Sequence, residues 1–168
     1  METTVKLYSL EMKSAKTYEV AGLFVLGNIL FPQLCHLTHL GNMLLPIYFF
    51  TLIGAYKYGW KVGLMTAIVS PLINSMLFGM PEAVVLPVII VKSMLLAITA
   101  GIVAHYFNKV SISLLVAIII VYQIIGTLFE WVYIGDFYKA AIDFRMGIPG
   151  MLLEIFGGYL IIKHLIKG

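Results

Sequence analysis

The sequence predicts an all-α integral membrane protein with six transmembrane helices and both termini in the cytoplasm. Composition gives the first observation: 61% of the 168 residues are apolar and 11% are charged. Soluble domains carry about 25% charged residues, so a soluble globular domain is excluded. Long charge-free stretches and the distribution of basic residues give the other two. We expect residues 1–168 to form one membrane domain.

Six apolar segments are long enough, or nearly so, for the ~20 residues that cross a bilayer as a helix. They lie at roughly residues 18–36, 43–57, 62–79, 84–106, 111–134 and 148–166. The second is short, and its Leu44-Leu45-Pro46 start indicates an irregular beginning.

The longest expected outer connection is 135–147. There Asp136 should cap a short helix over 137–144, and Pro149 should start the sixth span. This short helix is either a solvated connector or a lid.

Basic residues set the predicted orientation. Eight lysines fall at the N-terminus, in even-numbered loops or at the C-terminus: Lys6, Lys13, Lys16, Lys57, Lys61, Lys109, Lys163 and Lys167. Only Lys139 and Arg145 fall in an odd-numbered loop. Because cytoplasmic loops are enriched in Lys and Arg, both termini are predicted to be cytoplasmic. The scattered cations mark topology, and no nucleic-acid partner is expected.

Three charged residues interrupt the predicted spans. At 1.5 Å per residue, Lys92 lies ~12 Å from the outer end of its span, Glu130 ~6 Å and Glu154 ~9 Å. Three helices therefore place a charge at one level of the membrane. Ionisable groups at that depth are costly and usually functional, so we expect one outward-facing polar site.

Uncharged polar residues extend this site. Gln123, Thr127 and Glu130 share one helix face, and Asn74 lies at the outer end of the third span. We expect Asn74 and Gln123 to be hydrogen-bonding neighbours of the three charges. A structural ion pair between Lys92 and one glutamate is the alternative. However, one lysine cannot neutralise two carboxylates, and the surplus suits a bound ligand or a proton relay.

Other motifs give weaker signals. Cys35-His36-x-x-His39 offers three metal ligands without a fourth, so neither a metal nor another cofactor is expected. Small residues at Ala97/Gly101 and Ala100/Ala104 indicate helix contacts. Two aromatic groups are interpreted as interfacial anchors or packing residues: Tyr48, Phe49 and Phe50, and Trp131 with Tyr133. The sequence has no catalytic motif and no phosphate-binding loop, so an enzyme is not expected.

Residues 41–82 carry a more specific pattern. It comprises Leu44-Leu45-Pro46, glycines at 54, 59 and 63, Ser70-Pro71, and Gly79-Met80-Pro81. This pattern resembles the substrate-binding S components of energy-coupling factor (ECF) vitamin transporters, in particular the pantothenate-, folate- and queuosine-type branch. Ile47-Tyr48 stands where related members often have Met-His, which indicates a different ligand.

The resemblance implies a six-helix subunit, in the cell membrane of a prokaryote, that captures a water-soluble vitamin or related precursor from outside. It further implies a membrane T component and two cytoplasmic ATPases as partners, with the pocket at the outer side. The Ala-x-x-x-Ala docking face often found in the first span is absent. The Ala21/Gly22/Gly27 region or the Ala97/Gly101 face is therefore expected to contact the T component.

Two other functions stay open at this point. One is a small membrane-embedded enzyme or proton-coupled carrier that uses Glu130 and Glu154 as acid/base groups. The other is a membrane-assembly protein without a ligand.

Overall fold

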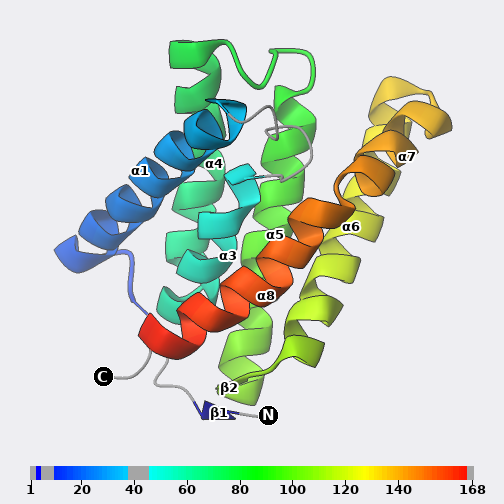
Figure 1. Ribbon diagram of the computed structural model, residues 1–168. Coiled ribbons are helices and arrows are strands. Elements are labelled where there is room, and N and C mark those ends of the chain that lie inside the picture. The colour runs from blue at the N-terminus through cyan, green and yellow to red at the C-terminus, as the bar shows by residue number, and fades with distance from the viewer. Residues whose placement is uncertain (1–2, 5–9, 38–45, 166–168) are drawn as a thin grey trace.

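The computed structural model describes residues 3–4, 10–37 and 46–165, and the predicted all-α class is confirmed for them (Figure 1). The helices are α1 (Ala15–Leu37), α3 (Pro46–Tyr58), α4 (Trp60–Phe78), α5 (Leu86–Phe107), α6 (Ile112–Ile134), α7 (Phe137–Met146) and α8 (Ile148–Leu165). Two short strands, β1 (Thr3–Thr4) and β2 (Lys109–Val110), pair antiparallel.

By length and composition, several of the described helices are suited to a multi-pass membrane protein. Four of them, α1, α4, α5 and α6, are long and apolar enough to cross a bilayer, and α7 with α8 forms a fifth candidate bent by 43°. The expected second span, 43–57, is represented by α3, which has 13 residues. Such a helix is about 20 Å long, against ~30 Å of hydrocarbon. Residues 43–45 lie outside the described part of the chain, and the number of six spans stays a prediction.

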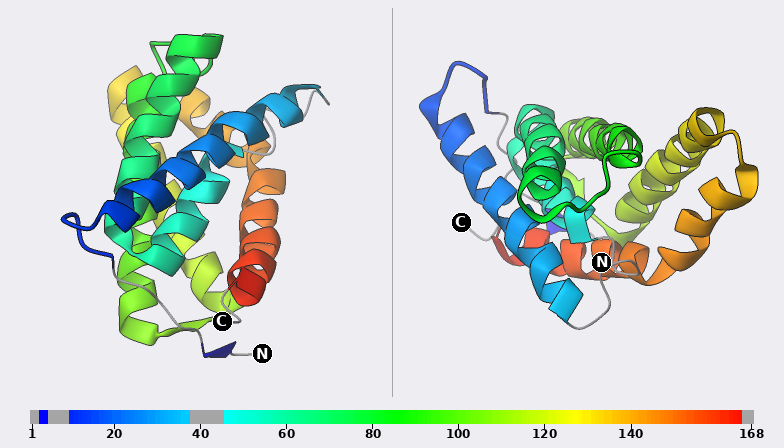
Figure 2. Two further views of the ribbon diagram at one scale, coloured as in Figure 1. Left: turned by 90° about the vertical axis from the view of Figure 1, so that its left-hand side faces the viewer. Right: turned by 90° about the horizontal axis from the view of Figure 1, so that it is seen from above.

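Helix α3 occupies the middle of the bundle. It packs against α1, α4, α5 and α8, and α1 and α8 cross it at a slant (Figures 1 and 2). Because neighbours surround it, ten of its residues are buried. Tyr48 and Phe49 are among them, which confirms packing rather than interfacial anchoring for these two side chains.

Small residues allow the close packing around α3. A methyl group at Gly63 would lie 2.4 Å from the Ala55 Cβ, and one at Gly101 would lie 2.5 Å from the Trp60 Cβ. The small-residue positions on α5 therefore make helix contacts, as predicted. Ala97 and Gly101 are buried within the chain itself, so this face cannot also be the contact with a T component. That expectation is corrected.

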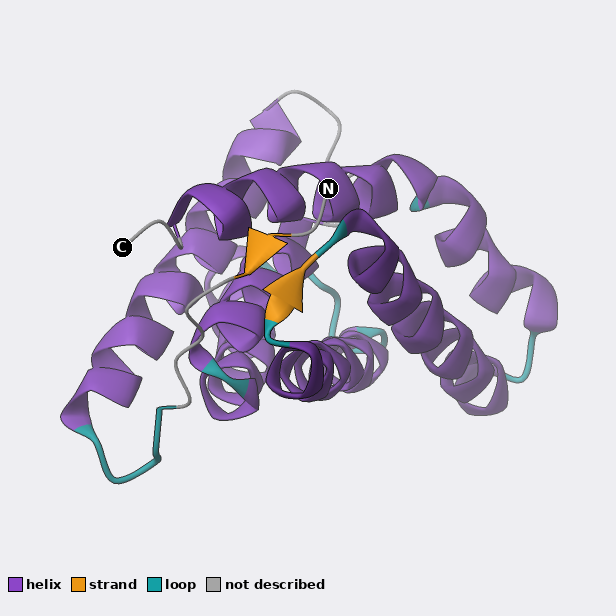
Figure 3. Ribbon diagram, turned by 90° about the horizontal axis from the view of Figure 1, so that it is seen from below, coloured by secondary structure: helices purple, strands orange, loops and turns teal. Residues whose placement is uncertain are grey.

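One end of the bundle gathers several distant segments (Figure 3). There Thr3 pairs with Val110, the Tyr56 hydroxyl donates to the Lys109 carbonyl at 2.6 Å, and the Leu10 N–H donates to the Tyr58 carbonyl. We call this the basic end, because the described helix ends and links there carry Lys13, Lys16, Lys57, Lys61, Lys109 and Lys163.

The opposite end is called the α7 end. Asp136 Oδ1 accepts hydrogen bonds from the Tyr138 and Lys139 N–H groups, at 2.9 and 3.2 Å, which confirms the predicted cap. The predicted helix 137–144 is present as α7, and Pro149 lies in the first turn of α8. Helix α7 packs against α6 and α8, and its role as a lid stays a prediction.

Exposed aromatic side chains occur at both ends. Trp60, Tyr106 and Phe107 lie at the basic end, and Trp131 and Tyr133 lie at the α7 end. Amphipathic rings favour the two membrane–water interfaces. This pattern suits a bundle whose long helices cross the bilayer between the two ends.

Candidate functional site

Two of the predicted charges meet in the half of the bundle toward the α7 end. Lys92 lies near the start of α5 and Glu130 near the end of α6, and the Lys92 Nζ donates to Glu130 Oε2 at 2.6 Å. The two residues are only 1% and 5% exposed. The structural ion-pair alternative predicts this pairing. The expected polar site includes the same two residues, so the pairing is compatible with both.

A glycine on α6 makes this pairing possible. A methyl group at Gly126 would lie 2.5 Å from Lys92 Cγ, so the methylene stem of the lysine runs directly over this position. Gly126 precedes Glu130 by one turn and therefore lies on the same face. The missing side chain allows the ammonium group to reach the carboxylate across the helix interface.

Glu154 has a different partner. It is fully buried on α8, and the Tyr122 hydroxyl of α6 donates to its carboxylate, 3.1 Å from Oε2 and 3.2 Å from Oε1. The Tyr122 ring packs on Tyr48 of α3, with ring centroids 5.7 Å apart. In the described part of the chain, no cation bonds to this carboxylate. Glu154 is thus the surplus carboxylate that the charge count predicted.

Two polar side-chain oxygens without described hydrogen-bond partners lie on the same face of α6. Gln123 is 1% exposed, and its Oε1 has no hydrogen-bond partner among the described residues. The same holds for the Thr127 Oγ1, one turn further along. An unsatisfied buried polar group costs about 1–3 kcal/mol, so a run of them beside an ion pair calls for an explanation.

Asn74 belongs to a separate cluster that joins α1, α3 and α4. Its Nδ2 donates to the Asn28 carbonyl at 2.9 Å, and Asn28 Nδ2 donates to Thr51 Oγ1 and Ser70 Oγ. Among the described hydrogen bonds, none joins Asn74 to the three charged residues. The Asn74 Oδ1 is, however, buried and unpartnered as well.

The structure thus brings Lys92 and Glu130 together and places Gln123 on the face that holds Glu130. Four residues of these clusters were not among the predicted ones: Asn28, Thr51, Ser93 and Tyr122. Ser93 follows Lys92 in the chain and donates to Thr51 Oγ1 at 3.4 Å, which links the two clusters. Asn28, as a buried amide in an apolar span, was a usable signal. Tyr122 gave none, because an aromatic residue in such a span is ordinary.

The Cys35-His36-x-x-His39 motif is only partly described. Cys35 is buried on α1. The His36 side chain and all of His39 lie outside the described part. Elsewhere among the described residues, no group of three or more His, Cys, Asp or Glu side chains is suited to hold a metal ion.

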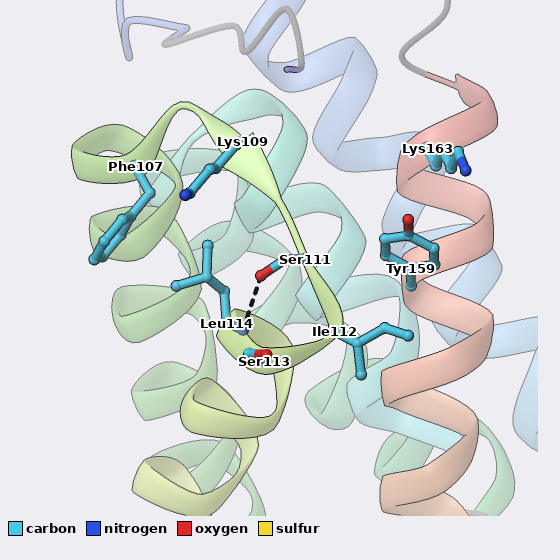
Figure 4. Close-up of a pocket in the computed structure, with 8 residues that line it drawn as sticks. All are labelled: Phe107, Lys109, Ser111, Ile112, Ser113, Leu114, Tyr159 and Lys163. Carbon is cyan, nitrogen blue, oxygen red and sulfur yellow. Dashed lines mark hydrogen bonds between the residues drawn. The ribbon is translucent and has the colours of Figure 1, made fainter. Parts of the chain in front are cut away.

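A cavity of about 640 Å³ lies at the other end of the same helices (Figure 4). It lies between the α5–α6 link and the last turns of α8, at the basic end. Its lining residues are Phe107, Lys109, Ser111, Ile112, Ser113, Leu114, Tyr159 and Lys163. None of the predicted site residues lines it.

Comparison with known proteins does not assign the chain to a family, because no family model, curated protein or solved structure matches it.

Proposed function

We propose that the chain is the substrate-capture subunit of an ECF-type importer. In this proposal it binds a water-soluble vitamin or related precursor outside a prokaryotic cell, and a T component and two ATPases drive uptake. The observation that carries the binding role is the face of α6 on which Gln123 and Thr127 present buried, unpartnered oxygens beside the Lys92–Glu130 pair. A ligand with N–H or O–H donors would satisfy these oxygens.

The proposal includes six spans with both termini in the cytoplasm. The basic end then faces the cytoplasm, as expected from the distribution of lysines. The α7 end, with Lys92, Glu130 and Glu154 below it, faces outward. A ligand would reach the site from the α7 end.

Residues that carry the ECF resemblance have identifiable structural roles, which supports its use here. Pro46 begins α3, and Gly63 allows α4 to pack closely against Ala55 of α3. Ser70 accepts the hydrogen bond from Asn28 in the buried polar cluster. The pattern is therefore part of how α1, α3 and α4 pack.

Replacing Gln123 by methionine tests the binding role. The change removes the unpartnered oxygen at similar volume, so the ligand-free protein should be as stable as the parent or up to ~3 kcal/mol more stable. Native mass spectrometry should detect a small molecule retained by the purified parent, chemically unaltered, and much less of it on Gln123→Met. Thermal unfolding of ligand-free samples measures the stability.

Ile124→Met is the matched control, because Ile124 follows Gln123 in α6 and its side chain is exposed. It should retain the small molecule at the parent level. If Gln123→Met loses stability and retains as much small molecule as the parent, the amide has a structural role and the binding face is wrong.

The exposed face of α1 is the remaining candidate contact with the T component. Ala21 and Gly27 pack inward, whereas a methyl group at Gly22 would meet nothing within 4 Å. Gly22→Trp should therefore leave folding and ligand binding intact but reduce uptake at least tenfold in cells that also produce the partner subunits. Leu128→Trp, on the exposed side of α6, is the control that should transport normally. Normal uptake by Gly22→Trp would exclude this face.

Glu154 gives the second candidate function a specific basis. A fully buried carboxylate whose described partner is a single tyrosine hydroxyl is also what a proton-coupled carrier or membrane enzyme would use. Recovery of a chemically altered compound would favour the enzyme. Accumulation of substrate by vesicles that contain this chain alone would favour the carrier.

A further inference from the structure

The cavity at the basic end is not used by the proposed ligand site. Two segments far apart in the sequence form it: Lys109, Ser111 and Ser113 come from the α5–α6 link and the start of α6, and Tyr159 and Lys163 come from α8 (Figure 4). The cavity volume of about 640 Å³ leaves room for a polar headgroup.

The polar part of the lining is suited to an anion. It holds two lysines, two serines and a tyrosine, and none of the eight described lining residues is acidic. The Ser111 Oγ accepts the Leu114 N–H at 3.3 Å and so caps the 23-residue helix α6, whose first N–H groups add partial positive charge at this position. The Lys163 Nζ lies 5.5 Å from the centre of the Tyr159 ring, which holds the ammonium group on the α8 side of the cavity. Ammonium and hydroxyl donors of this kind bind phosphate oxygens.

The rest of the lining is apolar, and it lies at the end of the bundle that is expected to meet a membrane surface. Phe107, Ile112 and Leu114 contribute it, and the first two are exposed. The exposed aromatic residues Trp60 and Tyr106 lie at the same end of the bundle, where rings favour the interface. A soluble phosphate would not need apolar walls. A lipid phosphate with attached acyl chains would.

We propose that this cavity binds the phosphate headgroup of an anionic phospholipid from the leaflet at the basic end. Lys109 and Lys163 supply the charge, the serines and Tyr159 supply hydrogen-bond donors, and Phe107, Ile112 and Leu114 contact the start of the acyl chains. Basic pockets between transmembrane helices bind anionic headgroups in the same way.

The test uses delipidated, purified full-length protein titrated with phosphatidylglycerol or with phosphatidylcholine of the same acyl chains. Native mass spectrometry measures binding, and thermal unfolding measures stabilisation. Phosphatidylglycerol should bind more tightly and raise the melting temperature more. In Lys109→Gln/Lys163→Gln the affinity for phosphatidylglycerol should fall roughly ten- to thirtyfold, because each lysine near an anionic headgroup adds to the binding free energy.

Lys13→Gln/Lys16→Gln is the matched control, since it removes the same charge at the same end from two exposed positions outside the cavity. It should change the affinity for phosphatidylglycerol less than threefold. Equal losses in both double variants would overturn the proposal in favour of general surface charge. Equal binding of the two lipids would overturn it directly.

Two further measurements keep the proposal falsifiable if the lysine variant folds poorly. Ser113→Trp should fill the cavity without a change of charge and reduce phosphatidylglycerol binding to a similar extent. Inorganic phosphate at millimolar concentration should not compete. If it displaces the lipid or gives the same stabilisation, the cavity is a site for soluble phosphate, and the lipid assignment is wrong.

Discussion

Lys92→Met should lower the free energy of unfolding by about 3–5 kcal/mol, because it leaves Glu130 buried without the ammonium group that now lies 2.6 Å away. Methionine keeps most of the stem that packs over Gly126, so lost volume contributes little. Thermal or denaturant unfolding in detergent measures the change. Lys139→Met, at an exposed position on α7, should change stability by less than 0.5 kcal/mol or so.

The double variant Lys92→Met/Glu130→Gln separates charge pairing from ligand binding. Removing both charges should restore most of the lost stability, because position 130 then no longer holds a buried charge that has lost the Lys92 ammonium group. If Lys92 and Glu130 bind ligand, this restored protein should retain little of the small molecule seen on the parent. A stable double variant that retains it fully would make the pair a structural link between α5 and α6. Equal instability of the single and double variants would show that the two charges are not coupled.

The meeting of Lys92 and Glu130 was predictable because it depends on helix direction and on a constant rise per residue. These two quantities place a charge at a depth before any packing is known. Asp136 was predictable for a local reason: a side-chain acceptor before a helix satisfies N–H groups a few residues away. Both inferences use only neighbouring residues or one helix at a time.

The central position of α3 was not predictable. Its sequence is apolar on all sides, and in a membrane protein such a helix can face lipid or protein equally well. Gly59, with φ at 97°, separates α3 from α4, and α3 therefore ends at Tyr58. The sequence indicated a break near this position but not that α3 would be surrounded by other helices.

The partners within the polar clusters also depend on tertiary packing. Glu154 meets Tyr122 because α8 crosses α6 at that level, and Asn74 meets Asn28 because α1 crosses α4. Depth alone cannot decide which side chains at one level touch. The basic-end cavity was not predicted for another reason: Lys109 and Lys163 were interpreted only as markers of orientation.

Glu154→Gln should weaken ligand binding by roughly ten- to a hundredfold, because a hydrogen bond to a charged group contributes about 1.5–3 kcal/mol and ~1.4 kcal/mol is a factor of ten. Glutamine keeps the shape and can still accept from Tyr122, so the ligand-free protein should be at least as stable as the parent. Retention of the small molecule in native mass spectrometry and thermal unfolding are measured on the same samples. Glu82→Gln, an exposed acidic residue at the α7 end, should match the parent in both.

Tyr122→Phe separates the two roles of Glu154. It removes the described partner of the carboxylate and should cost about 1–3 kcal/mol of stability, while the carboxyl group that a ligand would meet is kept. If Glu154 binds ligand, the two variants should therefore give opposite patterns. Glu154→Gln should lose ligand and keep its stability, whereas Tyr122→Phe should lose stability and retain more ligand than Glu154→Gln. If Glu154→Gln instead retains the small molecule fully and loses as much stability as Tyr122→Phe, the two residues form a structural hydrogen bond between α6 and α8. Glu154 would then have to be removed from the proposed site, leaving Lys92, Glu130 and Gln123 to bind the ligand.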